Sequence, residues 1–250
     1  MTDRPWKRDA RAPSGGFRGR LPGWGNKLRK TILLGFASGV LLSMGMVGCL
    51  RWINPPTSAF MIRDWFSIGK DARIQYVWID MEKVAPVMRM AVVAAEDQKF
   101  PFHSGFDFKS ISDAVRERME NQRIRGASTI TQQVAKNLFL WPGQCFLRKG
   151  LEAYFTILIE TLWPKRRILE IYLNIVEFGE STYGVSAAAQ RFFRKPASRL
   201  TVREAALLAA VLPNPKRFNV MTPSAHVYAR IRWIESQMAQ LGGPAYLKPL

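Results

Sequence analysis

Apolar and polar positions divide the chain into a continuous apolar stretch near its start and a longer mixed region behind it. Residues 31–50 contain no charged side chain, and at about 1.5 Å per residue a helix of this length spans the roughly 30 Å hydrocarbon layer of a bilayer. A cleaved signal peptide has a shorter apolar core of about 7–15 residues, and here Arg51 and Trp52 follow the stretch as interfacial anchors would. The pattern predicts one N-terminal transmembrane helix over residues 31–53.

Charge around this helix indicates on which side of the membrane each end lies. The formal net charge is +18, and no acidic residue occurs between Asp9 and Asp64, whereas Lys and Arg adjoin the N-terminal side of the helix. The positive-inside rule then makes residues 1–30 a basic cytoplasmic tail and places residues 54–250 on the exported side of the membrane. Contact with anionic membrane lipid is a sufficient explanation for the tail, so we expect no nucleic-acid partner.

Behind the membrane stretch, apolar positions recur mostly at helical spacing. Helices are predicted at residues 90–95, from 107 or 110 to about 121, and at 129–138, 148–162, 165–176, 182–193, 201–212 and from 222 onward. Thr201 and Glu204 form a capping box at the start of one of them. The single strand pattern lies at residues 74–79. The expected fold is mainly α, with one domain of about 200 residues and a small hydrophobic, membrane-proximal lobe.

Cysteine and histidine are too few for a disulfide framework or a multi-histidine metal site. The sequence has two of each. Cys49 lies in the membrane stretch and Cys145 in the exported part, so no disulfide is expected. His103 and His226 are far apart, which makes a multi-histidine metal site implausible, and no Gly-x-Ser-x-Gly elbow is present.

Carboxylates, a histidine and aromatic side chains gather in AAEDQKFPFHSGFD, residues 94–107. Glu96 and Asp97 stand where an apolar helical segment meets chain rich in Pro and Gly. A carboxylate at such a junction can be half buried, with its pKa raised toward that of a working base. A solvated helix end explains the same two residues equally well.

A second polar segment is GASTITQQVAKNLFL, residues 126–140. Ser128 and Thr129 precede a helix that carries Gln133 and Lys136. Hydroxyls, side-chain amides and a helix N-terminus suit sugars and phosphates.

Two further segments follow. In RKGLEAY, residues 148–154, Arg148 and Lys149 share a helical face with Glu152. An ordinary intrahelical ion pair is the alternative interpretation of that spacing. Residues 168–195 then read as a helix, a Gly-rich turn and a small-residue helix.

These segments resemble, in order, the motifs of the glycosyltransferase family 51 domain, the peptidoglycan glycosyltransferases, in its single-domain membrane-anchored form. The matching segments are EDQKFPFHSGFD, GASTITQQVAKN, RKGLE, YLNIVEFGESTYGVSAAAQRFF and REAALLAAVLPNPKRF. The resemblance covers about residues 74–221. We expect no penicillin-binding transpeptidase domain, because nothing like its Ser-x-x-Lys and Lys-Thr-Gly motifs follows.

The resemblance implies a lysozyme-like, mainly helical fold that polymerises lipid II at the outer face of the bacterial cytoplasmic (inner) membrane. The products would be linear β-1,4 glycan strands and undecaprenyl diphosphate. Glu96 matches the family's general base, which removes the proton from the acceptor's 4-hydroxyl in one inverting displacement. Glu152 matches the second motif glutamate, which helps to order the diphosphate side or a divalent ion.

The resemblance also implies a set of substrate-binding residues. The expected set is Asp97, Ser128, Thr129, Gln133, Lys136, Arg148 and Lys149. Its cations would neutralise the leaving diphosphate, and Asp97 with His103 would hold the first-motif loop. We expect that no cofactor is required. If a divalent ion binds near Glu152, Mg²⁺ or Mn²⁺ is the expected ion.

One position departs from the family pattern. Gln144 and Cys145 stand where many relatives have an arginine followed by a small hydroxyl residue. If that arginine contacts the diphosphate, one cation is missing here, so we expect reduced rather than absent activity.

Two other functions remain open from the sequence. One is a lysozyme-like muralytic hydrolase, in which water replaces the sugar acceptor, and the other is a membrane-anchored, non-catalytic cell-wall scaffold. The expected partners are lipid II, the growing glycan chain and membrane lipid, with other cell-wall synthesis or division proteins as a further class.

Overall fold

The structure, a computed structural model, describes residues 24–68, 73–108, 112, 128–143 and 145–250. The chain divides between Ser43 and Met44 into two compact units. Helix α1, Trp24–Cys49, begins in the first unit. Within the described ranges it is the one helix long and apolar enough to cross a membrane. Its large apolar side chains are mostly exposed, as expected for a helix that faces lipid.

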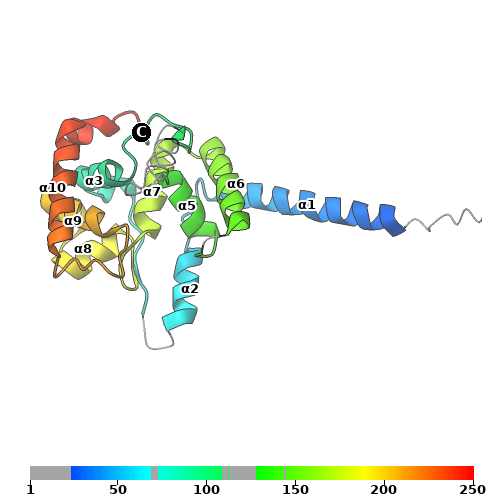
Figure 1. The fold of residues 1–250 in the computed structure, drawn as a ribbon, viewed down its shortest axis with the longest axis horizontal. Helices are drawn as coiled ribbons and strands as arrows, with labels where there is room; N and C mark the ends of the chain where they lie inside the picture. The colour runs from blue at the N-terminus through cyan, green and yellow to red at the C-terminus, as the bar shows by residue number, and fades with distance from the viewer. Residues whose placement is uncertain (1–23, 69–72, 109–111, 113–127, 144) are drawn as a thin grey trace, which may run out of the picture. The chain divides into compact units, whose positions relative to one another are not determined.

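The second unit is mainly helical, which confirms the predicted fold class (Figure 1). Its elements are α2 (Ala59–Ile68), β1 (Gln75–Tyr76), η1 (Met81–Lys83), α3 (Pro86–Glu96), α5 (Ile130–Phe139), α6 (Phe146–Leu162), α7 (Lys165–Ile175), β2 (Glu177–Gly179), β3 (Thr182–Tyr183), α8 (Val185–Phe193), η2 (Ala197–Arg199), α9 (Val202–Val211), α10 (Ala225–Gln240) and η3 (Gly243–Leu247). Figure 1 shows α7 between the α5/α6 pair and the group formed by α3, α8, α9 and α10.

Helix α3 is the apolar segment that ends in the candidate base. Pro86 occupies its first turn, where the missing N–H of proline costs no hydrogen bond. Val92, Val93 and Ala94 are completely or almost completely buried, because α9 and α10 both pack against α3. The helix therefore runs through the core and ends at Glu96, where the core meets polar groups.

Capping boxes explain where α5 and α9 begin. In α5 the Thr129 hydroxyl accepts a hydrogen bond from the backbone N–H of Gln132, whose side chain accepts one from the Thr129 N–H. Thr201 and Glu204 make the same exchange at α9. Each box satisfies two backbone donors that a helix start leaves free. The box predicted for Thr201 and Glu204 is confirmed.

A small three-stranded sheet has the order β1-β3-β2, with β1 parallel and β2 antiparallel to β3. The predicted strand at 74–79 was too long, because only Gln75 and Tyr76 pair. The prediction also missed β2 and β3, which are only three and two residues long and show no alternation of apolar and polar residues.

Gly184 separates β3 from α8, so the helix predicted at 182–193 begins later than expected. Its φ of +81° is a conformation that favours glycine, and a Cβ there would lie 2.6 Å from the carbonyl oxygen of Asn174. No larger residue fits. The last helix also begins later than predicted, since Ser224 rather than Thr222 caps α10. The helix predicted to end near residue 121 falls almost wholly outside the described ranges.

Candidate active site

Glu96 is the last residue of α3, and its side chain is only 13% exposed. One carboxylate oxygen, Oε2, accepts a hydrogen bond of 2.9 Å from Nε2 of Gln133 on α5. The amide oxygen of Gln133 in turn accepts a hydrogen bond of 3.1 Å from the hydroxyl of Tyr172 on α7. Three helices therefore converge on this one carboxylate.

A fourth helix, α10, supplies a cation. Nη2 of Arg230 lies 3.4 Å from the other carboxylate oxygen of Glu96 and 3.4 Å from the carbonyl oxygen of Ala95. The guanidinium also lies over the ring of Trp233, 5.8 Å from its centroid. Arg230 thus binds both the end of α3 and the carboxylate that α3 carries.

Burial decides the ionisation of Glu96. It raises the pKa of this carboxyl above its ordinary value, while the hydrogen bond from Gln133 and the charge of Arg230 act in the opposite direction without cancelling it. The neighbouring charge of Asp97 raises the pKa further. A carboxylate with a raised pKa takes up a proton more readily than an exposed one, as a general base must.

The cations predicted from the sequence lie together on α5 and α6. Burial lowers the pKa of Lys136, and the charges of Arg148 and Lys149 lower it further, whereas the carboxylate of Glu152 raises it. The ammonium of Lys136 also lies over the ring of Phe60 on α2, 5.7 Å from its centroid. Because Lys136 also feels the charge of Glu96, the base and the cation cluster form one electrostatic site.

Glu152 is held between two cations of its own helix. Nη1 of Arg148 lies 2.6 Å from one carboxylate oxygen and Nζ of Lys149 lies 2.5 Å from the other. The side chains of Arg148 and Glu152 are 9% and 4% exposed, while that of Lys149 is 53% exposed. The shared helical face predicted from the spacing is confirmed. Nε of Arg148 is buried with no hydrogen-bond partner among the described residues.

The divalent ion predicted beside Glu152 does not fit these contacts. Mg²⁺ or Mn²⁺ needs carboxylate or other oxygen ligands, and both oxygens of Glu152 already face cations. The described part of the chain holds no group of three or more His, Cys, Asp or Glu side chains that could bind a metal. We derive no step through a metal ion.

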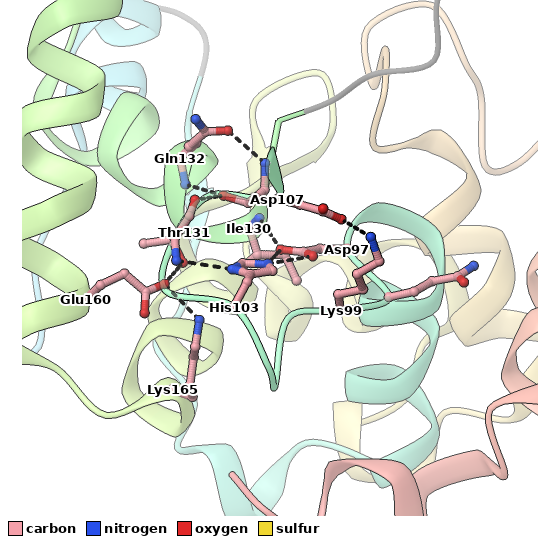
Figure 2. Close-up of polar contacts among 12 residues, drawn as sticks. Asp97, Lys99, His103, Asp107, Ile130, Thr131, Gln132, Glu160 and Lys165 are labelled. Carbon is pink, nitrogen blue, oxygen red and sulfur yellow. Dashed lines mark hydrogen bonds and ion pairs between the residues drawn. The ribbon is translucent and has the colours of Figure 1, made fainter. Parts of the chain in front are cut away.

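Asp97 and His103 hold the loop behind Glu96, as Figure 2 shows. Nε2 of His103 lies 2.9 Å from a carboxylate oxygen of Asp97, and the backbone N–H of Gly105 donates to Nδ1 of the same ring. Since Nδ1 accepts, the proton of the neutral ring is on Nε2 and is donated to Asp97. Asp97 also accepts a hydrogen bond of 3.0 Å from the N–H of Ile130, the first residue of α5, a favourable position for a negative charge.

Thr129 and Ser128 differ sharply in exposure. Thr129 is 3% exposed, and its hydroxyl donates to the carbonyl oxygen of Gly105 at 2.7 Å in addition to capping α5. Ser128 is exposed. In this geometry Thr129 and Asp97 fasten the loop to α5, whereas Ser128 is accessible; the substrate contacts predicted for all three remain predictions.

A second set of contacts, centred on Glu160, links helices α5, α6 and α7. Glu160 on α6 accepts a hydrogen bond of 2.5 Å from the Thr131 hydroxyl and pairs with Lys165 at 2.8 Å (Figure 2). The ammonium of Lys165 lies over the ring of Phe100, 4.6 Å from its centroid. These contacts connect α5, α6, α7 and the first-motif loop.

Of the two residues that depart from the family pattern, Gln144 and Cys145, the structure describes Cys145. Gln144 lies outside the described residues. Cys145 is exposed and is the N-cap of α6, where its Sγ accepts from the N–H of Arg148 at 3.4 Å.

Sequence reasoning missed Tyr172 and Arg230. Tyr172 opens the matched segment YLNIVEFGESTYGVSAAAQRFF but was given no role there, and Arg230 reads as one of several basic residues on α10. Both reach Glu96 or its partner only through tertiary contacts, so no local spacing could have identified them.

Sequence similarity to known proteins identifies the family of the chain. The family model described as Transglycosylase matches residues 66–239. The chain is 48% identical over 232 residues to a biosynthetic peptidoglycan transglycosylase of Xylella fastidiosa, covering 91% of this chain and 93% of the relative. It is 57% identical over 199 residues to a protein of the same name from Escherichia coli, covering 77% and 82%. A Klebsiella oxytoca relative of that name is 53% identical over 210 residues, covering 82% and 86%.

Proposed function

The chain belongs to the transglycosylase family and is a glycosyltransferase of peptidoglycan synthesis, and from this premise we propose that its substrate is lipid II. The chain would join lipid II units into linear β-1,4 glycan strands and release undecaprenyl diphosphate. Helix α1 would anchor it in the cytoplasmic membrane, with residues 1–30 inside and residues 54–250 on the periplasmic side. The apolar, exposed surface of α1 supports the anchor, and the basic residues before it support the orientation.

The observation that carries the proposal is the carboxylate of Glu96 beside a cluster of cations. A buried carboxyl with a raised pKa can accept a proton, and Lys136 with the Arg148–Glu152–Lys149 group provides positive charge within its field. Proton acceptance and neutralisation of a leaving diphosphate are the two tasks that a sugar transfer from a diphosphate carrier requires.

In the proposed reaction the ionised Glu96 takes the proton of the acceptor's 4-hydroxyl. The oxygen left with the electron pair attacks the anomeric carbon of the donor, and the bond from that carbon to the diphosphate oxygen breaks. The electron pair of the broken bond leaves with the diphosphate, and the α-linked donor becomes a β-linked product by one inversion. Every atom is then accounted for without a covalent intermediate on the protein.

The cations would act on the leaving group. Arg148 and Lys149 pair with Glu152, and Lys136 lies within the electrostatic influence of all three. Lys149, whose side chain is the more exposed of the Glu152 partners, would reach the diphosphate most easily. Glu152 would hold the two α6 cations in place, and Gln133 and Ser128 would orient sugar and phosphate.

Incubation of the detergent-solubilised full-length chain with lipid II, and separately with preformed glycan strands, tests the reaction class. The proposal predicts polymer from lipid II and no shortening of preformed strands. Shortened strands without polymer from lipid II would contradict it and favour the hydrolase.

A further inference from the structure

The side-chain amide of Gln133 is held at both of its ends. Nε2 lies 2.9 Å from Oε2 of Glu96, and Oε1 lies 3.1 Å from the hydroxyl of Tyr172. Tyr172 is completely buried on α7, and Gln133 is the partner of its hydroxyl within the described ranges. A chain of hydrogen bonds therefore runs from the interior of α7 through α5 to the carboxylate at the end of α3.

The chemistry of the three groups determines which group donates and which accepts in each of these hydrogen bonds. An ionised carboxylate can only accept hydrogen bonds, so Gln133 must present its NH₂ group to Glu96 and its oxygen to Tyr172. Burial raises the pKa of Tyr172 well above its ordinary value, and the charges of Glu96 and Asp97 raise it further. The phenol is therefore protonated throughout the working pH range and serves as the donor.

The opposite orientation of the amide would favour the wrong ionisation state. With its oxygen toward Glu96, Gln133 could hydrogen-bond only to the protonated carboxyl. An amide donor stabilises the ionised form of a carboxyl, and an amide acceptor stabilises the neutral form. A group that selects one orientation thus selects one charge state of Glu96.

We propose that Tyr172 is a positioning residue, whose hydroxyl fixes the amide of Gln133 in the orientation that donates to Glu96. The inference rests on the proposed role of Glu96 as the base. Because Tyr172 has no exposed surface and its hydroxyl donates to Gln133, it acts on Glu96 through Gln133.

Other charges around Glu96 do not change when the hydroxyl is removed. Arg230 on α10 lies 3.4 Å from the carboxylate, Lys136 on α5 attracts it, and Asp97 next to it in the chain repels it. Tyr172→Phe removes one oxygen atom and leaves each of these charges in place. The variant therefore isolates the effect of the amide orientation.

The test measures the protonation of Glu96 in two independent ways on the full-length solubilised chain. One is the pH dependence of kcat/KM for lipid II polymerisation. The other is a ¹³C NMR titration of the substrate-free protein labelled at its glutamate carboxyls, in which the Glu96 signal is the one that Glu96→Gln removes. In Tyr172→Phe we expect the acid limb and the titration to move up by about half to one pH unit, a three- to tenfold lower rate below the limb, because one ordinary hydrogen bond is lost.

Tyr183→Phe is the matched control. Tyr183 is 1% exposed, and its hydroxyl donates to Asp64 at 2.7 Å rather than to the site. We expect it to move neither the acid limb nor the Glu96 titration. A second variant, Gln133→Met, removes the amide altogether and should move the titration at least as far as Tyr172→Phe does.

The outcomes separate this inference from the proposed function. An unmoved Glu96 titration in Tyr172→Phe overturns the inference, even if Gln133→Met moves it, as does an equal movement in Tyr183→Phe. If the wild-type chain makes no polymer from lipid II, the proposed function is contradicted, and the titration of the substrate-free protein still decides the role of Tyr172.

Discussion

Nη2 of Arg230 lies 3.4 Å from Oε1 of Glu96, although 134 residues separate them in the chain. Burial raises the pKa of Glu96, and the positive charge of Arg230 is one of the influences that lower it. Helix α10 thus brings to the site a cation that none of the sequence motifs around Glu96 contains.

Replacing Arg230 with methionine should weaken the base. The change keeps most of the side-chain volume but removes the charge, so the pKa of Glu96 should rise further, and the acid limb of kcat/KM should move up by about one pH unit. At pH values below the limb this corresponds to a roughly tenfold lower rate. Arg203→Met, which breaks a more exposed pair with Glu235, should leave the profile unchanged. A uniform loss at all pH values would contradict the electrostatic role.

Glu96 should reduce stability at high pH. A carboxyl whose pKa is raised by folding stabilises the protein below its unfolded pKa, and this contribution is lost as pH rises through the folded pKa. Because burial raises the pKa of Glu96, Glu96→Gln should have a higher Tm than the wild type at pH 8 but not at pH 4. Thermal unfolding followed by circular dichroism measures both. The same Tm difference at the two pH values would show that the charge of Glu96 has no such effect.

Asp64 should stabilise the fold at neutral pH and lose this effect as pH falls, the opposite of Glu96. Burial alone would raise its pKa, but hydrogen bonds from Lys216 at 2.8 Å and Tyr183 at 2.7 Å outweigh burial, and the pKa is lowered. The contribution is therefore present above the unfolded pKa and is lost as pH falls. Since the change leaves the buried Tyr183 hydroxyl without its acceptor, Asp64→Ala should lower the free energy of unfolding by about 1–3 kcal/mol at pH 7 and by less at pH 3.

Urea denaturation of the solubilised protein measures this loss. The control is Asp80→Ala, which removes an exposed pair with Lys83 and should leave the unfolding midpoint unchanged. Equal losses for the two variants would contradict the role of the Asp64 contacts.

The effect of Glu177 on stability should change near a defined pH. Burial raises its pKa to about 7, with a further rise from Asp64 and an opposing effect of Lys216. Its stabilising contribution should be lost as pH rises through about 7, so Glu177→Gln should raise Tm at pH 8 and not at pH 4. Glu204 is the matched opposite: hydrogen bonds from Lys195 and Thr201 outweigh burial and lower its pKa. Glu204→Gln should therefore lower Tm at pH 8, and a shift of the same sign in both variants would contradict the account.

The sequence predicted well those elements that local chemistry determines. Thr201 and Glu204 of the capping box are three positions apart in the chain, and Arg148 and Glu152, which share a helical face, are four positions apart. Both formed as expected. The apolar pattern also placed Glu96 at the end of a helix, where the structure has it, whereas its role as the base follows from the family resemblance and stays a prediction.

Elements that depend on distant partners were not predictable in the same way. Strands β2 and β3 are short, and β1 pairs with β3 across more than a hundred residues, so alternation had too few positions to show. Tyr172 and Arg230 look like ordinary members of amphipathic helices. Their roles arise only when α7 and α10 pack near the end of α3, and this packing is a property of the whole fold.

Polymerisation of lipid II by the full-length solubilised chain, compared with Glu96→Gln, tests the central claim most directly. Products are resolved by size, and Glu235→Gln serves as a surface carboxylate control. We predict glycan polymer from the wild type and the control, and a rate lower by a factor of about 10²–10⁴ in Glu96→Gln, because general base catalysis contributes about that much. Equal polymer from the wild type and Glu96→Gln would contradict the assignment of Glu96 as the base.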